Sequence, residues 1–132
     1  MSAIATARTI LVCPSNPIVS IGPILAIPAI RAAIKASSAP IVAVSPIVSG
    51  APIKGPAHTL MRALGIEVSA LGVARFYQDW IGGFIFDERD APLQKDIEAL
   101  GLTAAHLDTM MVSAEVSEAI ARAALGIADR LR

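Results

Sequence analysis

A loop at residues 14–22 carries the first side chains in the sequence whose types and spacing could do chemistry. It offers two hydroxyls, one carboxamide and main-chain N–H groups, contributed by Ser15, Asn16, Ser20, Ile21 and Gly22. Groups of this kind solvate phosphate oxygens when a helix begins among them. The prolines of the loop fix its path, so less ordering entropy is lost when a ligand binds. The loop therefore predicts an anion-binding site.

A second loop, residues 45–55, has a similar character. It begins with the hydroxyl of Ser45 and ends with the cation of Lys54, and Gly55 would let a ligand approach the backbone. Pro56 then fits the first position of a helix. Neither loop has the spacing of a P-loop or of a dinucleotide-binding glycine fingerprint. The alternative interpretation is that both loops are rigid turns whose polar side chains bond their own backbone.

Other polar side chains are open to two interpretations. His58 would lie in the first turn of the next helix, where an imidazole could contact a phosphate, although a packed or surface histidine is the alternative. Asp87 and Asp90 follow the third expected strand and could hold a metal or a ribose hydroxyl, or else cap a helix. The same choice applies to Asp108. We assign no role to His106.

Short apolar runs predict the strands that must position these loops. Residues 9–13, 40–45 and 84–87 are rich in β-branched or aromatic residues, and the alternation of elements favours a fourth strand ending near Asp108. Cys13 is expected to be buried in the first strand. Helices are expected to begin at Ser20 and to cover residues 28–36, 56–64, 69–77, 91–100 and 113–131.

The repeated order of strand, loop and helix predicts an α/β fold. It is expected to be a Rossmann-like parallel sheet of about four strands with flanking helices, which is a partial fold. In such sheets ligands bind beyond the carboxyl ends of the strands. Both loops leave such ends, so we expect them to converge on one crevice.

The composition favours one domain over residues 1–132. A chain of 132 residues, 55% of them hydrophobic, can bury a core without disulfides, and its single cysteine cannot form one internally.

Eleven basic and eleven acidic residues argue against binding to nucleic acid or to an anionic membrane. Prolines interrupt both long uncharged stretches, which argues against transmembrane helices. With no signal-peptide pattern in residues 1–9, we expect a cytoplasmic protein.

The charge is distributed unevenly along the chain. Residues 1–66 contain five basic residues and no acid, whereas residues 67–132 contain eleven acids and six bases. A carboxylate beside a bound phosphate would weaken binding, so an acid-free half is expected to face an anion. Chance combined with apolar burial is the alternative explanation.

Several longer motifs resemble those of a known family. They are Pro-Ser-Asn-Pro-Ile-Val-Ser-Ile-Gly-Pro-Ile-Leu-Ala-Ile-Pro at residues 14–28, Ile30-Arg31, Val-Ala-Val-Ser-Pro-Ile-Val at 42–48, Lys-Gly-Pro at 54–56, Gly-Val-Ala at 72–74 and Phe86-Asp87. This ordered set closely resembles the 2-phospho-L-lactate transferase family of coenzyme F-420 biosynthesis. The resemblance extends over nearly the whole chain from about Ala7.

The resemblance implies a transferase that acts on a guanosine diphosphate (GDP) adduct of lactate or of enolpyruvate. Such an enzyme moves the phospholactyl group to the primary hydroxyl of the deazaflavin alcohol Fo and releases GMP with the help of magnesium. Carried over to this sequence, Ser15, Asn16, Ser20 and Gly22 match the loop near the guanosine phosphates. In the same way, Ser45, Lys54 and Gly55 match a second anion-facing loop.

The sequence departs from the family pattern in a few residues and in length. Ala29, Ser49 and Arg8 stand where the family pattern leads us to expect other residues. The family's chains are longer and carry an amino-terminal glycine-rich loop and metal-binding aspartates, so we expect this chain to correspond to the carboxyl-terminal half. We therefore expect no metal ligands here, and a partner that is an amino-terminal-half chain or a second copy, paired at an exposed sheet edge. The alternative is a non-catalytic nucleotide-binding module or truncated remnant.

Overall fold

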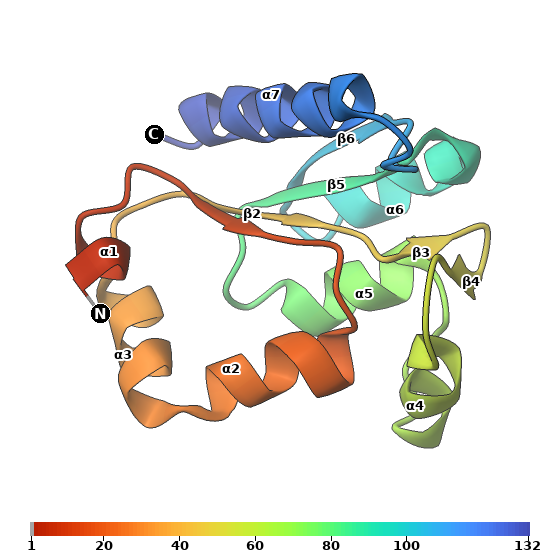
Figure 1. The fold of residues 1–132 in the computed structure, drawn as a ribbon, viewed down its shortest axis with the longest axis horizontal. Coiled ribbons are helices and arrows are strands. Elements are labelled where there is room, and N and C mark those ends of the chain that lie inside the picture. The colour runs from red at the N-terminus through yellow and green to blue at the C-terminus, as the bar shows by residue number, and fades with distance from the viewer. Residues whose placement is uncertain (1) are drawn as a thin grey trace.

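A four-stranded parallel sheet organises the computed structural model, which describes residues 2–132 (Figure 1). The strands are β1 (Ile10–Val12), β2 (Ile41–Val44), β5 (Gly83–Asp87) and β6 (Thr103–Leu107), in the order β1-β2-β5-β6. Leu11 lies opposite Val42, and Phe84 lies between Ala43 and Ala104. The predicted α/β fold with about four parallel strands is confirmed.

The two central strands are buried along their whole length, as continuous apolar runs require when both faces of a sheet are covered. One face packs on α5 (Ala70–Tyr77) through Ala43, Phe84 and Phe86. The same side of the sheet carries α2 (Gly22–Ala26), α3 (Pro28–Ala36), α4 (Ala57–Ala63) and α6 (Gln94–Glu98), and the short α1 (Ser2–Ala5) lies against α3.

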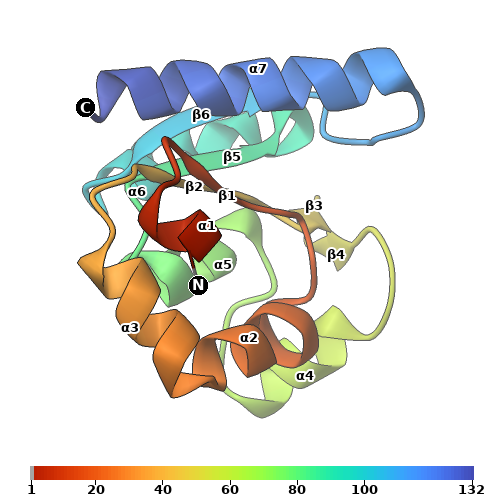
Figure 2. The ribbon, with the colours of Figure 1, turned by 60° about the vertical axis from the view of Figure 1, so that its left-hand side comes forward.

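The opposite face is covered by α7 (Ala114–Arg130), which runs across the sheet above the strands (Figure 2). The helix begins at Ser113, whose hydroxyl accepts a hydrogen bond from Val116 N. Ile120, Ala124 and Ile127 then pack on the sheet residues Val42, Val44 and Ile85. The predicted helix 113–131 is therefore present at nearly its predicted length.

The first loop differs from its prediction. Its helix begins at Pro17, as a wide helical turn η1 (Pro17–Ile21) that continues into α2, and not at Ser20. Asn16 is the residue that caps it, because a carboxamide followed by proline at the first helical position is a stronger start than a serine three residues later. Ser20 lies inside the turn and is exposed.

Three further predictions need correction. Cys13 is exposed because β1 ends at Val12 and forms an edge of the sheet. The predicted helix 91–100 is a 3-10 helix (Glu88–Leu93) followed by α6, since Pro92 cannot donate to an α-helical ladder. The second loop contains a small antiparallel hairpin of β3 (Ile47–Val48) and β4 (Ala51–Pro52).

No single helix within residues 2–132 is both long and apolar enough to cross a membrane. By length and composition only, the pair Pro17–Ala26 and Pro28–Ala36 meets that criterion together, with a bend of 85° between its two parts.

Candidate functional site

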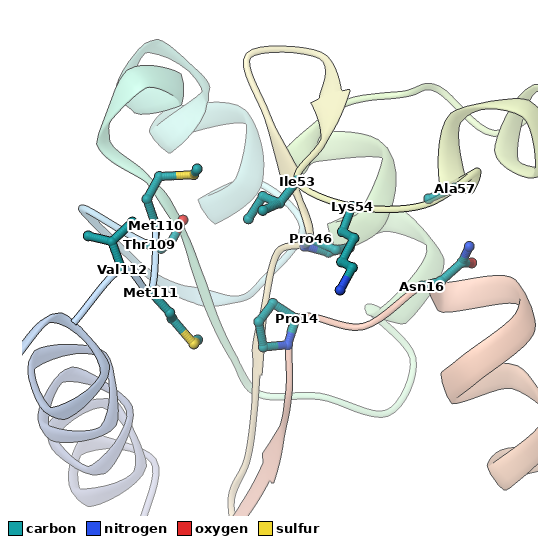
Figure 3. A pocket seen from close by; sticks show the side chains of 10 residues that line it. All are labelled: Pro14, Asn16, Pro46, Ile53, Lys54, Ala57, Thr109, Met110, Met111 and Val112. Carbon is teal, nitrogen blue, oxygen red and sulfur yellow. The ribbon is translucent and has the colours of Figure 1, made fainter. Parts of the chain in front are cut away.

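Three loops at the carboxyl ends of the strands enclose a cavity of about 240 Å³ (Figure 3). The loop after β1 contributes Pro14 and Asn16, and the segment after β2 contributes Lys54 among other residues. The third wall is residues 109–112, between β6 and α7. The structure thus brings together parts of both loops that the sequence singled out, and adds a third loop.

Asn16 presents a fixed donor at this site. Its Oδ1 accepts hydrogen bonds from Ile18 N (2.9 Å) and Val19 N (3.3 Å), which sets the orientation of the carboxamide. Its Nδ2 is buried and makes no hydrogen bond within residues 2–132. A buried donor without an acceptor costs about 1–3 kcal/mol, which the oxygen of a ligand would recover. Asn16 is therefore a lining residue of the cavity with an unused donor.

Lys54 supplies the positive charge of the cavity. Its side chain is exposed and extends toward Pro14 across the space between the first two loops (Figure 3). No carboxylate among the described residues forms an ion pair with it. The following Gly55 has φ +79°, a left-handed conformation that residues with a Cβ rarely adopt. That turn leads the chain from Lys54 into α4.

His58 lies in the first turn of α4 and follows the lining residue Ala57, but it does not itself line the cavity. Its Nε2 is 3.1 Å from Thr59 Oγ1. Its Nδ1 is buried and has no hydrogen-bond partner in the part of the chain that the structure describes. His58 Nδ1 is thus a second buried polar atom without a partner among residues 2–132.

The other predicted site residues lie elsewhere or are engaged by their own backbone. The Ser45 hydroxyl is fully buried and exchanges two 3.1 Å hydrogen bonds with the backbone of Ile47. Ser15 and Ser20 do not line the cavity, and Gly22 lines a different one. The N–H groups of Ile21 and Gly22 donate to the carbonyls of Asn16 and Pro17, so they are not free for an anion as the sequence suggested.

Asp87 has a structural task that explains the third wall. Its fully buried carboxylate accepts from Arg89 N and Nη1 (3.0 and 2.8 Å) and from Thr109 N and Oγ1 (2.9 and 3.0 Å). Burial by itself would raise the pKa of Asp87, but these hydrogen bonds outweigh burial and hold its pKa below the usual value. The carboxylate thereby fixes Thr109 and the three residues after it against the cavity.

The remaining acids also support loops. Asp90 Oδ2 accepts from Ser49 N at 2.9 Å and so holds the tip of the β3–β4 hairpin, where Ser49 has φ +50°. Asp108 Oδ1 accepts from Met110 N at 3.0 Å. Within residues 2–132 no three His, Cys, Asp or Glu side chains are grouped so as to hold a metal ion. The helix-cap interpretation of Asp87 is confirmed, since it caps the 3-10 helix.

Sequence reasoning missed the wall formed by residues 109–112. These residues are Thr109, two methionines and a valine, and the single hydroxyl among them does not mark a site. The available signal was Asp87 at the end of a buried strand, because a buried carboxylate must find donors and those donors identify the segment beside it.

The fold is that of an α/β protein, with the Asn16 carboxamide and Lys54 at the carboxyl edge of its parallel sheet, where ligands bind in proteins of this class. Comparison with known proteins gives the family. The family model described as "2-phospho-L-lactate transferase CofD" matches residues 1–125. The chain belongs to the CofD family.

Curated relatives agree with this assignment. The 2-phospho-L-lactate transferase of Methanosarcina barkeri is 44% identical over 131 residues, which cover 99% of this chain and 42% of that protein. The enzyme of the same name from Methanosarcina mazei is 48% identical over 121 residues, covering 92% and 39%. The phosphoenolpyruvate transferase of Kitasatospora aureofaciens is 42% identical over 133 residues, covering 100% and 41%. The chain thus spans about two fifths of the length of these relatives.

Proposed function

We propose that this chain forms the anion-holding part of a transferase in coenzyme F-420 biosynthesis. The substrate would be a GDP adduct of lactate or enolpyruvate, and the acceptor would be the primary hydroxyl of the deazaflavin alcohol Fo. The acceptor oxygen forms a bond to the phosphorus that carries the three-carbon acid, and the bond from that phosphorus to the oxygen of GMP breaks. The hydroxyl proton is released, and GMP leaves. We place this activity in the cytoplasm.

The observation that carries the proposal is that the oriented carboxamide of Asn16 and the cation of Lys54 line the same cavity. In phosphoryl transfer, catalysis consists mostly of positioning and of charge neutralisation. Asn16 Nδ2 would donate to a phosphate oxygen, and Lys54 would offset the charge that collects on the leaving phosphate. Asp87 contributes indirectly, because it holds residues 109–112 as the opposite wall.

Magnesium belongs to the proposal through the family resemblance. Asp87 has its carboxylate occupied by four hydrogen bonds, and no group of three metal-ligating side chains occurs within residues 2–132. The residues described here do not fit a protein-held magnesium site, so we derive no step through the ion. Substrate phosphates and carboxylates from the remaining part of the family's sequence would hold it.

A partner is proposed at the β1 edge of the sheet. Leu11 of β1 is 42% exposed, although it lies opposite the buried Val42. The helix α7 packs on β2, β5 and β6. An uncovered edge of a parallel sheet offers main-chain groups to another strand. We propose that the rest of the family's sequence, in the same chain or in another, pairs there. A second copy of this chain is the alternative partner.

A second candidate function is that of a non-catalytic nucleotide-binding module. It is favoured by the same absence of a metal-ligating group among residues 2–132. The two functions separate in a turnover assay, in which the GDP adduct, Fo and magnesium are incubated with the chain alone and with the remaining part of a relative. Release of GMP in either mixture supports the transferase. Nucleotide binding without GMP release in both mixtures supports the module.

Calorimetric titration with GDP and GMP, with and without magnesium, tests the site itself. Lys54→Ala should weaken nucleotide binding by about tenfold, as expected for the loss of a charged hydrogen bond to a phosphate. Asn16→Asp keeps the cap oxygen but replaces the donor by a second oxygen, so it should weaken binding at least as much. Arg62→Ala removes an exposed cation of α4 and serves as the control. Equal affinity for all four proteins, or no binding by the folded chain, contradicts the proposal.

A further inference from the structure

A second cavity, of about 710 Å³, lies among α2, α3 and the end of α5, and it shares no lining residue with the first. Its volume lies within the roughly 300–1,000 Å³ that sites for small organic molecules occupy. The proposed phosphate contacts of Asn16 and Lys54 lie in the first cavity, not in this one. Figures 1 and 2 show that the three helices lie on the same side of the sheet, opposite α7.

Two cations from one helix face line this cavity. Arg31 and Lys35 are four residues apart on α3, a spacing that places side chains next to each other. Like charges at this spacing repel, and Arg31 lies in the amino-terminal half of the helix, where the macrodipole disfavours a cation. Neither side chain forms an ion pair with an acid of residues 2–132, although Asp79 also lines the cavity. An anion between Arg31 and Lys35 would relieve their repulsion.

Two aromatic side chains form another wall. Trp80 is half-buried and is held edge-on against Tyr77, with ring centroids 5.1 Å apart and planes at 72°. Phe76 is 45% exposed although it belongs to the helix that packs on the sheet. Both rings line the cavity together with Leu25 and Ile34. Such a wall favours a flat apolar group, because aromatic faces stack on planar ligands.

From these two walls we propose that the cavity binds a planar aromatic organic anion. The negative group, a carboxylate, sulfonate or phosphate, lies between Arg31 and Lys35, where the guanidinium of Arg31 can donate two parallel hydrogen bonds. The ring lies against Phe76 and Trp80. Because the cavity is separate from the first one, this inference does not depend on the proposed transferase activity.

Titration with 1-naphthalenesulfonate, followed by NMR, tests the inference. Trp80 is the single tryptophan of the sequence, so its indole N–H gives one resonance that reports on this cavity. A saturable shift of that resonance is expected. Arg31→Ala and Lys35→Ala should each weaken the affinity about two- to fivefold, as for exposed charge pairs, and added salt should weaken it further. Both residues are exposed, so the variants should stay folded.

The controls separate this site from general binding to apolar surface. Arg62→Ala and Lys54→Ala should leave the affinity for the sulfonate unchanged, since neither residue lines the cavity. Arg31→Lys should retain more affinity than Arg31→Ala. The neutral analogue 1-naphthalenemethanol should bind more weakly to the unchanged chain. If the Trp80 resonance does not shift, or if the neutral analogue and the two alanine variants bind equally well, the inference is overturned.

Discussion

Asp87→Asn should destabilise the fold, because Asp87 joins β5 to the segment after β6 through four hydrogen bonds at a fully buried carboxylate. A carboxamide has one oxygen, so it can accept from the donors of Thr109 or from those of Arg89, but not from both. In either orientation a main-chain N–H faces the NH₂ group of the new side chain. An orphaned amide together with weaker remaining bonds amounts to about 3 kcal/mol. This is a large part of the roughly 5–15 kcal/mol that stabilises a domain.

The assay is urea unfolding followed by the fluorescence of Trp80, at pH 7 and in acid. Hydrogen bonds hold the pKa of folded Asp87 below that of the unfolded chain, about 3.9. Its stabilising contribution is therefore complete above that value and is lost as the pH falls through the lower, folded pKa. The side chain of the asparagine variant does not titrate, so the difference in free energy of unfolding between the two proteins should be smaller in acid than at pH 7.

Asp90→Asn is the matched control, because Asp90 makes a single hydrogen bond to Ser49 N in an exposed hairpin. We expect a loss below about 1 kcal/mol for it. The reasoning is refuted if Asp87→Asn lowers the free energy of unfolding no more than Asp90→Asn does at pH 7. It is also refuted if the loss caused by Asp87→Asn is the same in acid as at pH 7.

Three further predictions concern packing and exposure. Gly72→Ala should lower the free energy of unfolding by about 1–3 kcal/mol, because the new Cβ would lie 1.9 Å from Glu67 O. Gly126→Ala, on the exposed side of α7 with no atom within 4 Å of the new Cβ, should raise it by about 0.5–1 kcal/mol. A rise for Gly72→Ala or a fall for Gly126→Ala in urea unfolding would contradict this. Cys13 should react with an aromatic disulfide reagent in the native protein as fast as in urea, and protection in the native protein would show that the β1 edge is covered. Burial raises the pKa of Tyr77, the single tyrosine of the sequence, so the free energy of unfolding should fall as the pH rises above about 10. Tyrosinate absorbance should then appear only as the protein unfolds. Ionisation before unfolding would show that the ring is accessible.

The sequence predicted the architecture well because the relevant signals are local. Continuous runs of β-branched or aromatic residues marked β1, β2 and β5, and their alternation with helical segments implied a parallel sheet. The helices expected over residues 69–77 and 113–131 correspond to α5 and α7, and the structure shows Ser69 and Ser113 capping them. The family resemblance also lay in ordered motifs, and the family model matches the same chain over residues 1–125.

Local competition between signals explains where the fold prediction failed. Ser20 and Asn16 are both good helix caps, and only the position of Pro17 decided in favour of Asn16. Cys13 was expected to be buried because its run of residues is apolar, but exposure depends on whether a neighbouring strand covers the edge. No property of residues 9–13 records that neighbour.

The sequence by itself determined which residue types are available for an anion and that two loops would meet at the carboxyl ends of the strands. Tertiary structure decided which of those groups are free. The Ser45 hydroxyl is engaged by Ile47, whereas Asn16 Nδ2 has no partner within residues 2–132. It also decided that Asp87 holds Thr109. Strand pairing brings these two residues together from 22 positions apart. The physical reason is that hydrogen-bond satisfaction depends on neighbours in space, whereas residue type and helical or strand pattern are local along the chain.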